Sequence, residues 1–404
     1  MSKEKAGGPD WAKLPVTMQH QFFEKAEKEA KKAKHRLLQD ADKLKELQQS
    51  LKFRQPRVSD DWKDWIIGAV DGSDSPVLSE RIGVRYGTYG AGYMTFKYGI
   101  LLKEDYDSGH MSSQQVGDPE LSKKILELLT VKMEREKALE ISDNVDVLLF
   151  DGSFFAWRAG CHVIRDEPIS LDGYTKVAEL IDEVRELTFK LLNTGKSVGI
   201  IKRVRTAAID GWIACTKGEN SCLDRNDRAI LAYLMPPNSW FAYQWLFKPP
   251  EACNYYPYIR HIIKKDPTAD TETLIQKSRE RFVQGIRPAL GPDDPKDKTD
   301  FSPDLLKTTR YYYRATEAAP PFSFETHKDM PIEKLLGYFQ APGNINKATG
   351  LPFPIDLIDE NVSLPAGFTN EFVEEIEAQL IQDPELDKLD LSNSFAPINP
   401  QKKE

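Results

Sequence analysis

Two apolar segments of the sequence run into the same tripeptide, Asp-Gly-Ser, and each tripeptide carries a candidate catalytic carboxylate. In AVDGS the aspartate is Asp71, and in LLFDGS it is Asp151. Because Asp-Gly is common in turns, either site alone is adequately explained as a turn that follows a strand. If the two strands are neighbours in one sheet, however, both carboxylates project towards a common point at its rim.

A predicted helix between these two segments supplies a third acid. Residues 118–141 open with Asp-Pro, continue with apolar residues at helical spacing and carry Glu134 and Glu136. Three crowded carboxylates repel one another, and a divalent cation allows them to coexist. Oxygen ligands suit Mn²⁺ or Mg²⁺. Two such ions about 3.5–4 Å apart activate water and stabilise the leaving oxygen of a phosphodiester. The pattern therefore predicts metal-dependent phosphodiester hydrolysis.

Four further residues are candidates for contacts with a nucleic acid. Lys202 follows the apolar segment SVGII, where it can contact a phosphate, although a lysine at the edge of a sheet is an equally good interpretation. Arg203 and Arg205 add positive charge that suits a phosphate backbone. Tyr312 lies in a run of three tyrosines and can stack on an exposed base. Tyrosines in strands, however, more often serve in packing.

The elements that position these residues alternate between strands and helices. In residue ranges, the predicted order is strand 65–70, two strands within 81–102, helix 118–141, strand 145–150, helix 175–195 and strand 197–204. The two strands within 81–102 are expected to be joined around Gly90 and Gly92. This order predicts an α/β fold in which helices flank a mixed central sheet.

The chain is expected to contain one large domain with additions at both ends. We expect a helical arm at 1–60, a main domain at 61–382 with a polar helical and loop insertion at about 265–308, and a flexible tail at 383–404. The arm has no Gly or Pro from Gln19 to Phe53 and carries a narrow apolar stripe. It is read either as a helix packed on its own domain or as a contact helix for another subunit.

Composition narrows the functional classes. The 404 residues include 63 acidic and 55 basic side chains, for a net charge of -8, and 40% are hydrophobic, which excludes wholesale disorder. No apolar run is long enough for a membrane span, and the N-terminus has no apolar signal core, so we expect a cytoplasmic protein. The four cysteines contain no C-x-x-C pair, which argues against a disulfide framework and a zinc site. The net acidity argues weakly against nucleic-acid binding but does not exclude it, because local patches of charge matter more than the total.

Several segments, taken in order, resemble the NurA nuclease family. They are VDGSDS at Asp71, the MEREKALE helix, VDVLLFDGSFF at Asp151, GKSVGIIKRV with Lys202, NDRAILAYLMPP, and GLPFPIDLIDENVSLPAGF. The resemblance runs from about residue 62 to 380, apart from the insertion. It implies a ribonuclease-H-like fold and a manganese-dependent nuclease that degrades DNA from 5′ ends and cuts single strands. It also implies a homodimer that docks on a hexameric HerA-type DNA-translocating ATPase in DNA end processing, in repair or in defence.

The resemblance carries individual roles to this chain. Asp71 and Asp151 correspond to the family's two strand aspartates, and Glu134 fits the helix acid better than Glu136. The family's C-terminal region usually contains a histidine that completes the site, and the corresponding segment here has none. Asp359 or Glu360 is expected to replace it as a metal ligand, unless these are loop acids that face solvent.

Two functions follow from this reading. The first is a DNA nuclease in which Asp71, Glu134 and Asp151 hold two Mn²⁺ or Mg²⁺ ions, with Asp359 as a fourth ligand and Lys202 at the scissile phosphate. The second is a catalytically inactive adaptor that docks on the ATPase and guides DNA. The absent histidine favours the adaptor, whereas the retained carboxylates favour the nuclease.

Overall fold

The computed structural model describes residues 13–57, 59–81, 83–114, 117–171, 173–202, 206–290, 308–383 and 386. The chain divides into two units, Met1–Lys52 and Phe53–Glu404. The first unit contains the helix α1 (Val16–Gln48), which falls largely within the segment expected to be helical. Its side chains Phe22, Phe23 and Leu38 are exposed. Arg203, Arg205 and nearly all of the expected tail lie outside the described residues.

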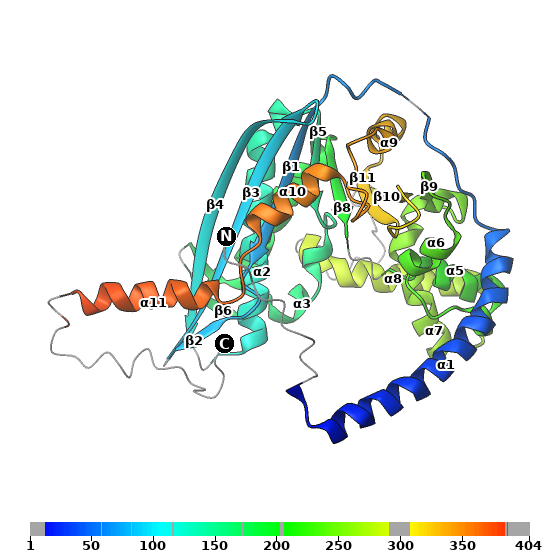
Figure 1. Ribbon diagram of the computed structural model, residues 1–404, viewed down its shortest axis with the longest axis horizontal. Coiled ribbons are helices and arrows are strands. Elements are labelled where there is room, and N and C mark those ends of the chain that lie inside the picture. Colours follow the sequence, from blue (N-terminus) through cyan, green and yellow to red (C-terminus); the bar gives the residue numbers. More distant parts are fainter. Residues whose placement is uncertain are drawn as a thin grey trace. The chain divides into compact units, whose positions relative to one another are not determined.

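A mixed β-sheet forms the centre of the second unit (Figure 1). Its strands are β1 (Ile66–Asp74), β2 (Ser79–Arg81), β3 (Val84–Lys97), β4 (Ile100–Gln114), β5 (Val147–Asp151), β8 (Ser197–Ile201), β9 (Ser239–Ala242), β10 (Thr308–Arg314) and β11 (Phe322–His327). The order across the sheet is β2-β3-β1-β5-β8-β11-β10-β9, and β4 pairs with β3. A separate hairpin joins β6 (Pro168–Leu171) and β7 (Tyr174–Lys176).

Three parallel strands at the middle of the sheet carry the candidate site. β1 pairs in parallel with β5, and β5 pairs in parallel with β8. The strands on either side of this group, β3 and β11, run antiparallel to their neighbours. Because the carboxyl ends of parallel strands meet at one edge, the residues that end β5 and follow β8 are brought together.

Helices cover both faces of the sheet. The α-helices described in this unit are α2 (Pro119–Ile141), α3 (Cys161–Ile164), α4 (Val177–Asn193), α5 (Ala208–Lys217), α6 (Asp227–Leu234), α7 (Ile259–Lys265), α8 (Thr271–Leu290), α9 (Ile332–Gln340), α10 (Phe353–Val362) and α11 (Phe368–Ile381). Short 3₁₀ helices are η2 (Ser142–Asn144), η3 (Ala156–Arg158), η4 (Glu219–Ser221), η5 (Tyr243–Trp245), η6 (Pro250–Asn254) and η7 (Tyr256–Tyr258). None of the helices in the described ranges combines the length and apolar character needed to cross a bilayer.

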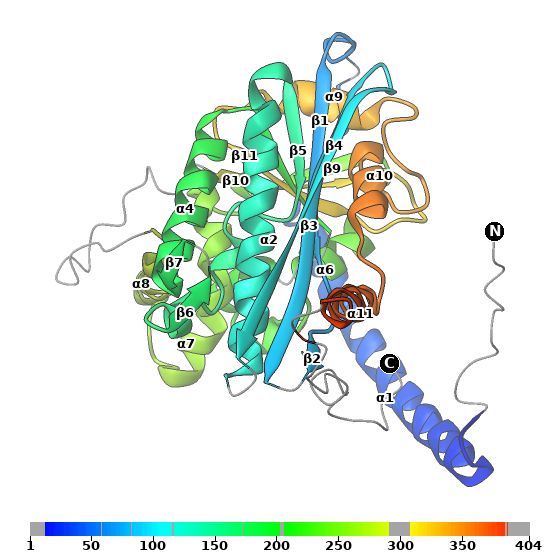
Figure 2. The same ribbon diagram turned by 90° about the vertical axis from the view of Figure 1, so that its left-hand side faces the viewer.

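The alternation of side chains along β1 separates two cores. Ala69 faces one side and packs in a cluster with Ile355 and Ile358 of α10. Val70 faces the other side and packs with Ala138 of α2 and Leu191 of α4. Figure 2 shows α2 and α4 on one side of the strands and α10 on the other. Asp71 follows in the same alternation, so its side chain belongs to the α10 face.

The expected turn at Gly90 and Gly92 is wrong. Both glycines lie inside β3, which continues to Lys97, and Gly92 pairs directly with Asp71. The chain turns instead at Tyr98 and Gly99, which have φ angles of 55° and 75°. Positive φ at both positions of a two-residue loop matches the right-handed twist of the strands that it joins. The polar composition after Leu102 concealed the length of β4, whose side chains are mostly exposed.

Candidate metal centre

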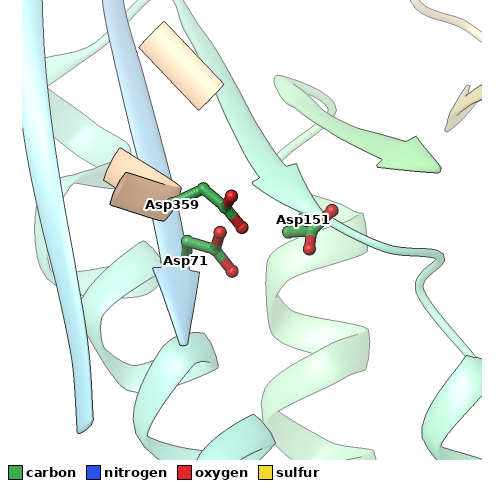
Figure 3. Close-up of side chains that lie close together, drawn as sticks. All are labelled: Asp71, Asp151 and Asp359. Atoms are coloured by element: carbon green, nitrogen blue, oxygen red, sulfur yellow. The ribbon is translucent and has the colours of Figure 1, made fainter. Parts of the chain in front are cut away.

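Three aspartates from separate elements meet at the edge of the sheet. Asp71 lies in β1, Asp151 ends β5 and Asp359 lies in α10. One carboxylate oxygen from each lies within 4.8 Å of the others, and Figure 3 shows the three side chains converging. The condition set by the sequence, that the two Asp-Gly-Ser strands are neighbours, is met, because Val70 pairs with Phe150 and the two aspartates follow directly. The expected strand end at Asp71 is wrong, because the first Asp-Gly-Ser lies inside β1, which continues to Asp74.

The three aspartates differ in their exposure to solvent. Asp71 is 2% exposed, Asp151 is intermediate and Asp359 is exposed. Burial, and next the charge of Asp151, raise the pKa of Asp71 well above its usual range. Burial also raises the pKa of Asp151, against the opposing effect of Lys202. A cation placed among these carboxylates would relieve the repulsion that contributes to both shifts.

Lys202 provides a positive charge inside the cluster. It follows β8, and its Nζ atom lies 2.6 Å from Asp359 Oδ1, 3.4 Å from Asp71 Oδ2 and 3.4 Å from Asp151 Oδ2. Burial opposes its charged form, but the carboxylates of Asp151, Asp71 and Asp359 together raise the pKa of Lys202. Three ionised carboxylates and one ammonium leave a net charge of -2, which suits a divalent cation.

Glu134 approaches the cluster from the opposite face of the sheet. It lies in α2, is nearly fully buried, and its Oε1 atom accepts a hydrogen bond from Arg135 Nη1 at 2.7 Å. Burial raises the pKa of Glu134 to about 7; Arg135 lowers it and Asp151 raises it. The Arg135 guanidinium stacks over Phe150, with its Cζ atom 4.2 Å from the ring centroid. Glu134 is therefore within electrostatic reach of Asp151 but outside the cluster of three aspartates.

The alternative acids lie elsewhere. Glu136 forms an ion pair with Lys132 of the same helix at 3.2 Å, and its side chain is 47% exposed. Glu360 follows Asp359 in α10 and is exposed, and it is not among the aspartates that converge. Of the two candidate acids in this C-terminal segment, Asp359 is therefore the one that lies beside Asp71 and Asp151.

Tyr312 does not fit the role expected from the sequence. It is fully buried in β10, and its hydroxyl lies 3.1 Å from the hydroxyl of Tyr243. Its ring also packs near Phe241. Both faces of this strand are covered, so the ring offers no accessible surface for a stacked base.

Two arginines that support the site were missed by sequence reasoning. Arg135 lies between Glu134 and Glu136 in the sequence, and it donates a hydrogen bond to Glu134. Arg228 of α6 donates from Nη1 to the carbonyl oxygen of Lys202 and from Nε to that of Pro321 at 2.9 Å. A basic residue directly beside a candidate acid was a usable signal for Arg135. Arg228 lies in the segment NDRAILAYLMPP, but the sequence does not reveal its role, because its partners Lys202 and Pro321 are distant in the chain.

The donor set fits a hard divalent cation. Asp71, Asp151 and Asp359 contribute oxygen atoms, and the cluster contains no thiolate or imidazole. Mn²⁺ and Mg²⁺ prefer such ligands, whereas zinc and copper sites usually include nitrogen or sulfur. The arrangement can therefore hold a cation where the parallel pairing of β1 with β5 ends, with the Lys202 ammonium group beside it.

A family model and similar solved structures both point to the NurA family. The NurA domain family model matches residues 66–364. The NurA nuclease from Sulfolobus solfataricus has a similar structure, with a TM-score of 0.54 and 14% identity over 92% of this chain and 99% of that one. NurA with manganese has a TM-score of 0.45 at 14% identity, covering 87% of this chain and 97% of that one. NurA bound to dAMP and manganese has a TM-score of 0.45 at 12% identity, covering 90% and 97%. No curated protein sequence matches the chain.

Proposed function

The chain belongs to the NurA family, and from that premise we propose that it is a divalent-metal-dependent DNA nuclease that hydrolyses phosphodiester bonds. The observation that carries the proposal is the convergence of Asp71, Asp151 and Asp359 around one point beside Lys202. We also propose that the sheet is ribonuclease-H-like. The position of Asp71 on the first strand, Glu134 on a helix and Asp151 on a later parallel strand supports this assignment.

We propose Mn²⁺ as the cofactor, with Mg²⁺ as a substitute and two ions for each active site. Asp71, Asp151 and Asp359 would hold the first ion, and Glu134 would join Asp151 around the second. Bound ions of this kind supply Lewis-acid polarisation of the phosphate and activation of water. The raised pKa values of Asp71 and Glu134 support the assignment, since two groups that resist ionisation in a metal-free site gain a partner when a cation binds.

The protein's own residues position the substrate. Lys202 remains an ammonium group and can donate hydrogen bonds to a phosphate oxygen of the DNA backbone. Arg228, which binds the carbonyl oxygen of Lys202, keeps this segment against α6. Arg135 holds Glu134 in place through a hydrogen bond and through packing on Phe150. Arg203 and Arg205 follow Lys202 in the sequence, and we propose that they contact the DNA backbone as well.

We infer the direction of cleavage, the oligomeric state and the partner from the family resemblance. We propose a 5′→3′ exonuclease that also cuts single strands, works in the cytoplasm as a homodimer, and acts with a hexameric HerA-type ATPase in DNA end processing. The net charge of -8 agrees with DNA delivery by a partner rather than unaided capture. The exposed Phe22, Phe23 and Leu38 of α1 support a role for the arm in subunit or partner contact.

Cleavage assays test the proposal directly. End-labelled linear duplex and single-stranded DNA are incubated with Mn²⁺, Mg²⁺ or EDTA, with and without the ATPase, using the wild type and Asp71→Asn. We expect cleavage with Mn²⁺, none in EDTA, and loss of cleavage by at least ~10³-fold in the variant. Equal cleavage by the two proteins would disprove the assigned site.

One observation favours the inactive adaptor as a second candidate. Lys202 already neutralises part of the acidic cluster without a metal, so the carboxylates have a partner even in a protein that never binds one. An adaptor would remain folded and bind the ATPase, yet would cut neither substrate under any metal condition. Residual cleavage that depends on Asp71 would exclude it.

A further inference from the structure

A buried glutamate that sequence reasoning did not single out contacts the chain directly after Asp151. Glu325 lies in β11, and its side chain is 4% exposed. Its Oε2 atom accepts hydrogen bonds from Ser153 Oγ at 2.7 Å and from the backbone nitrogen of Phe154 at 3.0 Å. Ser153 is the serine of the second Asp-Gly-Ser, so this carboxylate holds the tripeptide that carries Asp151.

An arginine balances the charge of Glu325 inside the protein. Arg310 of β10 pairs directly with Glu325 across the two strands, and its Nη2 atom lies 3.5 Å from Glu325 Oε1. Arg310 Nη1 donates to Thr206 Oγ1 at 2.9 Å, so the guanidinium is held on a second side. A buried carboxylate is stable in such a setting only with a charged partner and satisfied hydrogen bonds.

The backbone of the same turn is held from the neighbouring strand. Gly152 has a φ angle of 90°, and its nitrogen donates to the carbonyl oxygen of Ile200 at 2.8 Å. A Cβ atom at Gly199 would lie 2.4 Å from the carbonyl oxygen of Gly152, so only glycine permits this approach. With Gly152 tied to β8 and Ser153 tied to β11, the residue directly before them has little freedom to move.

We infer that Glu325 is a positioning residue, which fixes the carboxylate of Asp151 for metal binding by holding Ser153 and Phe154. This inference rests on the proposed function, because it takes Asp151 as a metal ligand. Glu325 reaches the site through Ser153 and does not itself belong to the converging aspartates. Groups that orient a ligand in this way typically change metal affinity by about 10–100-fold when they are removed.

The test measures Mn²⁺ binding to the full-length, DNA-free protein through the EPR signal of free Mn²⁺. Glu325→Gln keeps the shape of the side chain but loses its charge, and Ser153→Ala removes only the hydroxyl. We expect Mn²⁺ affinity to fall ~10-fold or more in Glu325→Gln and by a smaller factor in Ser153→Ala. Glutamine has one carbonyl oxygen where Glu325 uses one oxygen for Arg310 and the other for Ser153 and Phe154, so it cannot satisfy both sides. The effects of the two changes on Mn²⁺ affinity are expected to be less than additive in the double variant, because both changes act on the contact between residues 325 and 153.

A second glutamate–arginine pair, away from the aspartates, separates positioning from general loss of stability. Glu80 Oε1 accepts a hydrogen bond from Arg85 Nε at 2.7 Å, and Arg85 is buried and also contacts Ser122 in the first turn of α2. Ser122 and Glu134 are 12 residues apart on α2, or about 18 Å at 1.5 Å for each residue. Glu80→Gln should lower the thermal midpoint in EDTA and leave Mn²⁺ affinity unchanged.

The outcomes separate the two hypotheses. Wild-type affinity in both Glu325→Gln and Ser153→Ala would overturn the positioning role while leaving the proposed nuclease intact. A wild type that binds no Mn²⁺ would overturn the proposed function and the inference together. If Glu325→Gln does not fold, Ser153→Ala decides alone, since it removes one hydroxyl and leaves the Glu325–Arg310 pair in place.

Discussion

The Nζ atom of Lys202 lies 2.6 Å from Oδ1 of Asp359, and this contact joins the end of a central strand to a helix 157 residues further along the chain. The same ammonium is 3.4 Å from Asp71 and from Asp151. Lys202 thus stands among the carboxylates that we assign to a divalent cation. Its charge and the charge of the cation act on the same groups, so the two should compete electrostatically.

Removal of the Lys202 charge should make the stability of the protein depend more on a bound metal ion. We expect Lys202→Met to lose about 1–3 kcal/mol of unfolding free energy in EDTA, because three acids lose their counter-charge. Mn²⁺ should then raise its thermal midpoint more than it raises that of the wild type. Lys132→Met is the control, since Lys132 is similarly half-buried, 24% exposed against 19%, but pairs with Glu136 and Glu183. An equal effect of Mn²⁺ on all three proteins would contradict the competition.

Asp71, the most buried of the three converging aspartates, should lower the stability of the metal-free protein. Burial and the charge of Asp151 raise the pKa of Asp71, so its ionised form is unfavourable in a metal-free site. Asp71→Asn is expected to gain on the order of 1 kcal/mol in urea unfolding at pH 7.5 in EDTA. It should also abolish Mn²⁺ binding and DNA cleavage. A metal-free variant less stable than the wild type would show that Asp71 serves mainly the fold.

Much of this arrangement could be predicted from short-range patterns. The apolar runs before Asp71 and Asp151 predicted two strands, and both form and pair with each other. Only Asp151 ends its strand as expected, because β1 continues past Asp71 to Asp74. The helical spacing before Glu134 predicted α2, which begins at Pro119 with Asp118 as its N-cap. Such patterns depend on alternation and capping within one segment, which a single sequence displays directly.

Contacts between distant segments could not be predicted in the same way. Glu325 lies 172 residues from Ser153, and its role depends on the register of β11 against β8. Tyr312 was a candidate for base stacking because it lies in a run of tyrosines, but β10 lies between β9 and β11 and is buried on both faces. Register and coverage of a strand are tertiary properties, so residue type alone does not reveal them.

Adjacent acids in α10 provide a matched test of the fourth candidate ligand. Asp359 converges with Asp71 and Asp151, whereas Glu360 is the next residue and is exposed. Asp359→Asn should weaken Mn²⁺ binding and cleavage by ~10-fold or more. Glu360→Gln removes the same charge from the same helix and should change either quantity less than about twofold. Equal losses of Mn²⁺ binding in both variants would mean that Asp359 acts through the general negative charge of α10 and is not a metal ligand.

The pH dependence of protein stability should reveal the raised pKa of Glu134, and this measurement needs no DNA. Burial raises its pKa to about 7, while a glutamate in an unfolded chain has a pKa of about 4.3. Between these values the folded protein holds a proton that the unfolded chain has released, so stability from this group falls as pH rises from about 4 to about 7. The loss by pH 8 is on the order of 3 kcal/mol for a metal-free protein. Glu134→Gln remains neutral throughout and its amide oxygen can still accept from Arg135.

In EDTA, the thermal midpoint of the wild type should therefore fall relative to that of Glu134→Gln when pH rises from 5 to 8. Glu136→Gln serves as the control on the same helix, because Glu136 is half-exposed and paired with Lys132; its profile should run parallel to the wild type. Saturating Mn²⁺ should flatten the wild-type profile, since a bound cation favours the ionised carboxylate. Parallel profiles for the wild type and Glu134→Gln in EDTA would contradict the raised pKa and place an ordinary, ionised glutamate at this position.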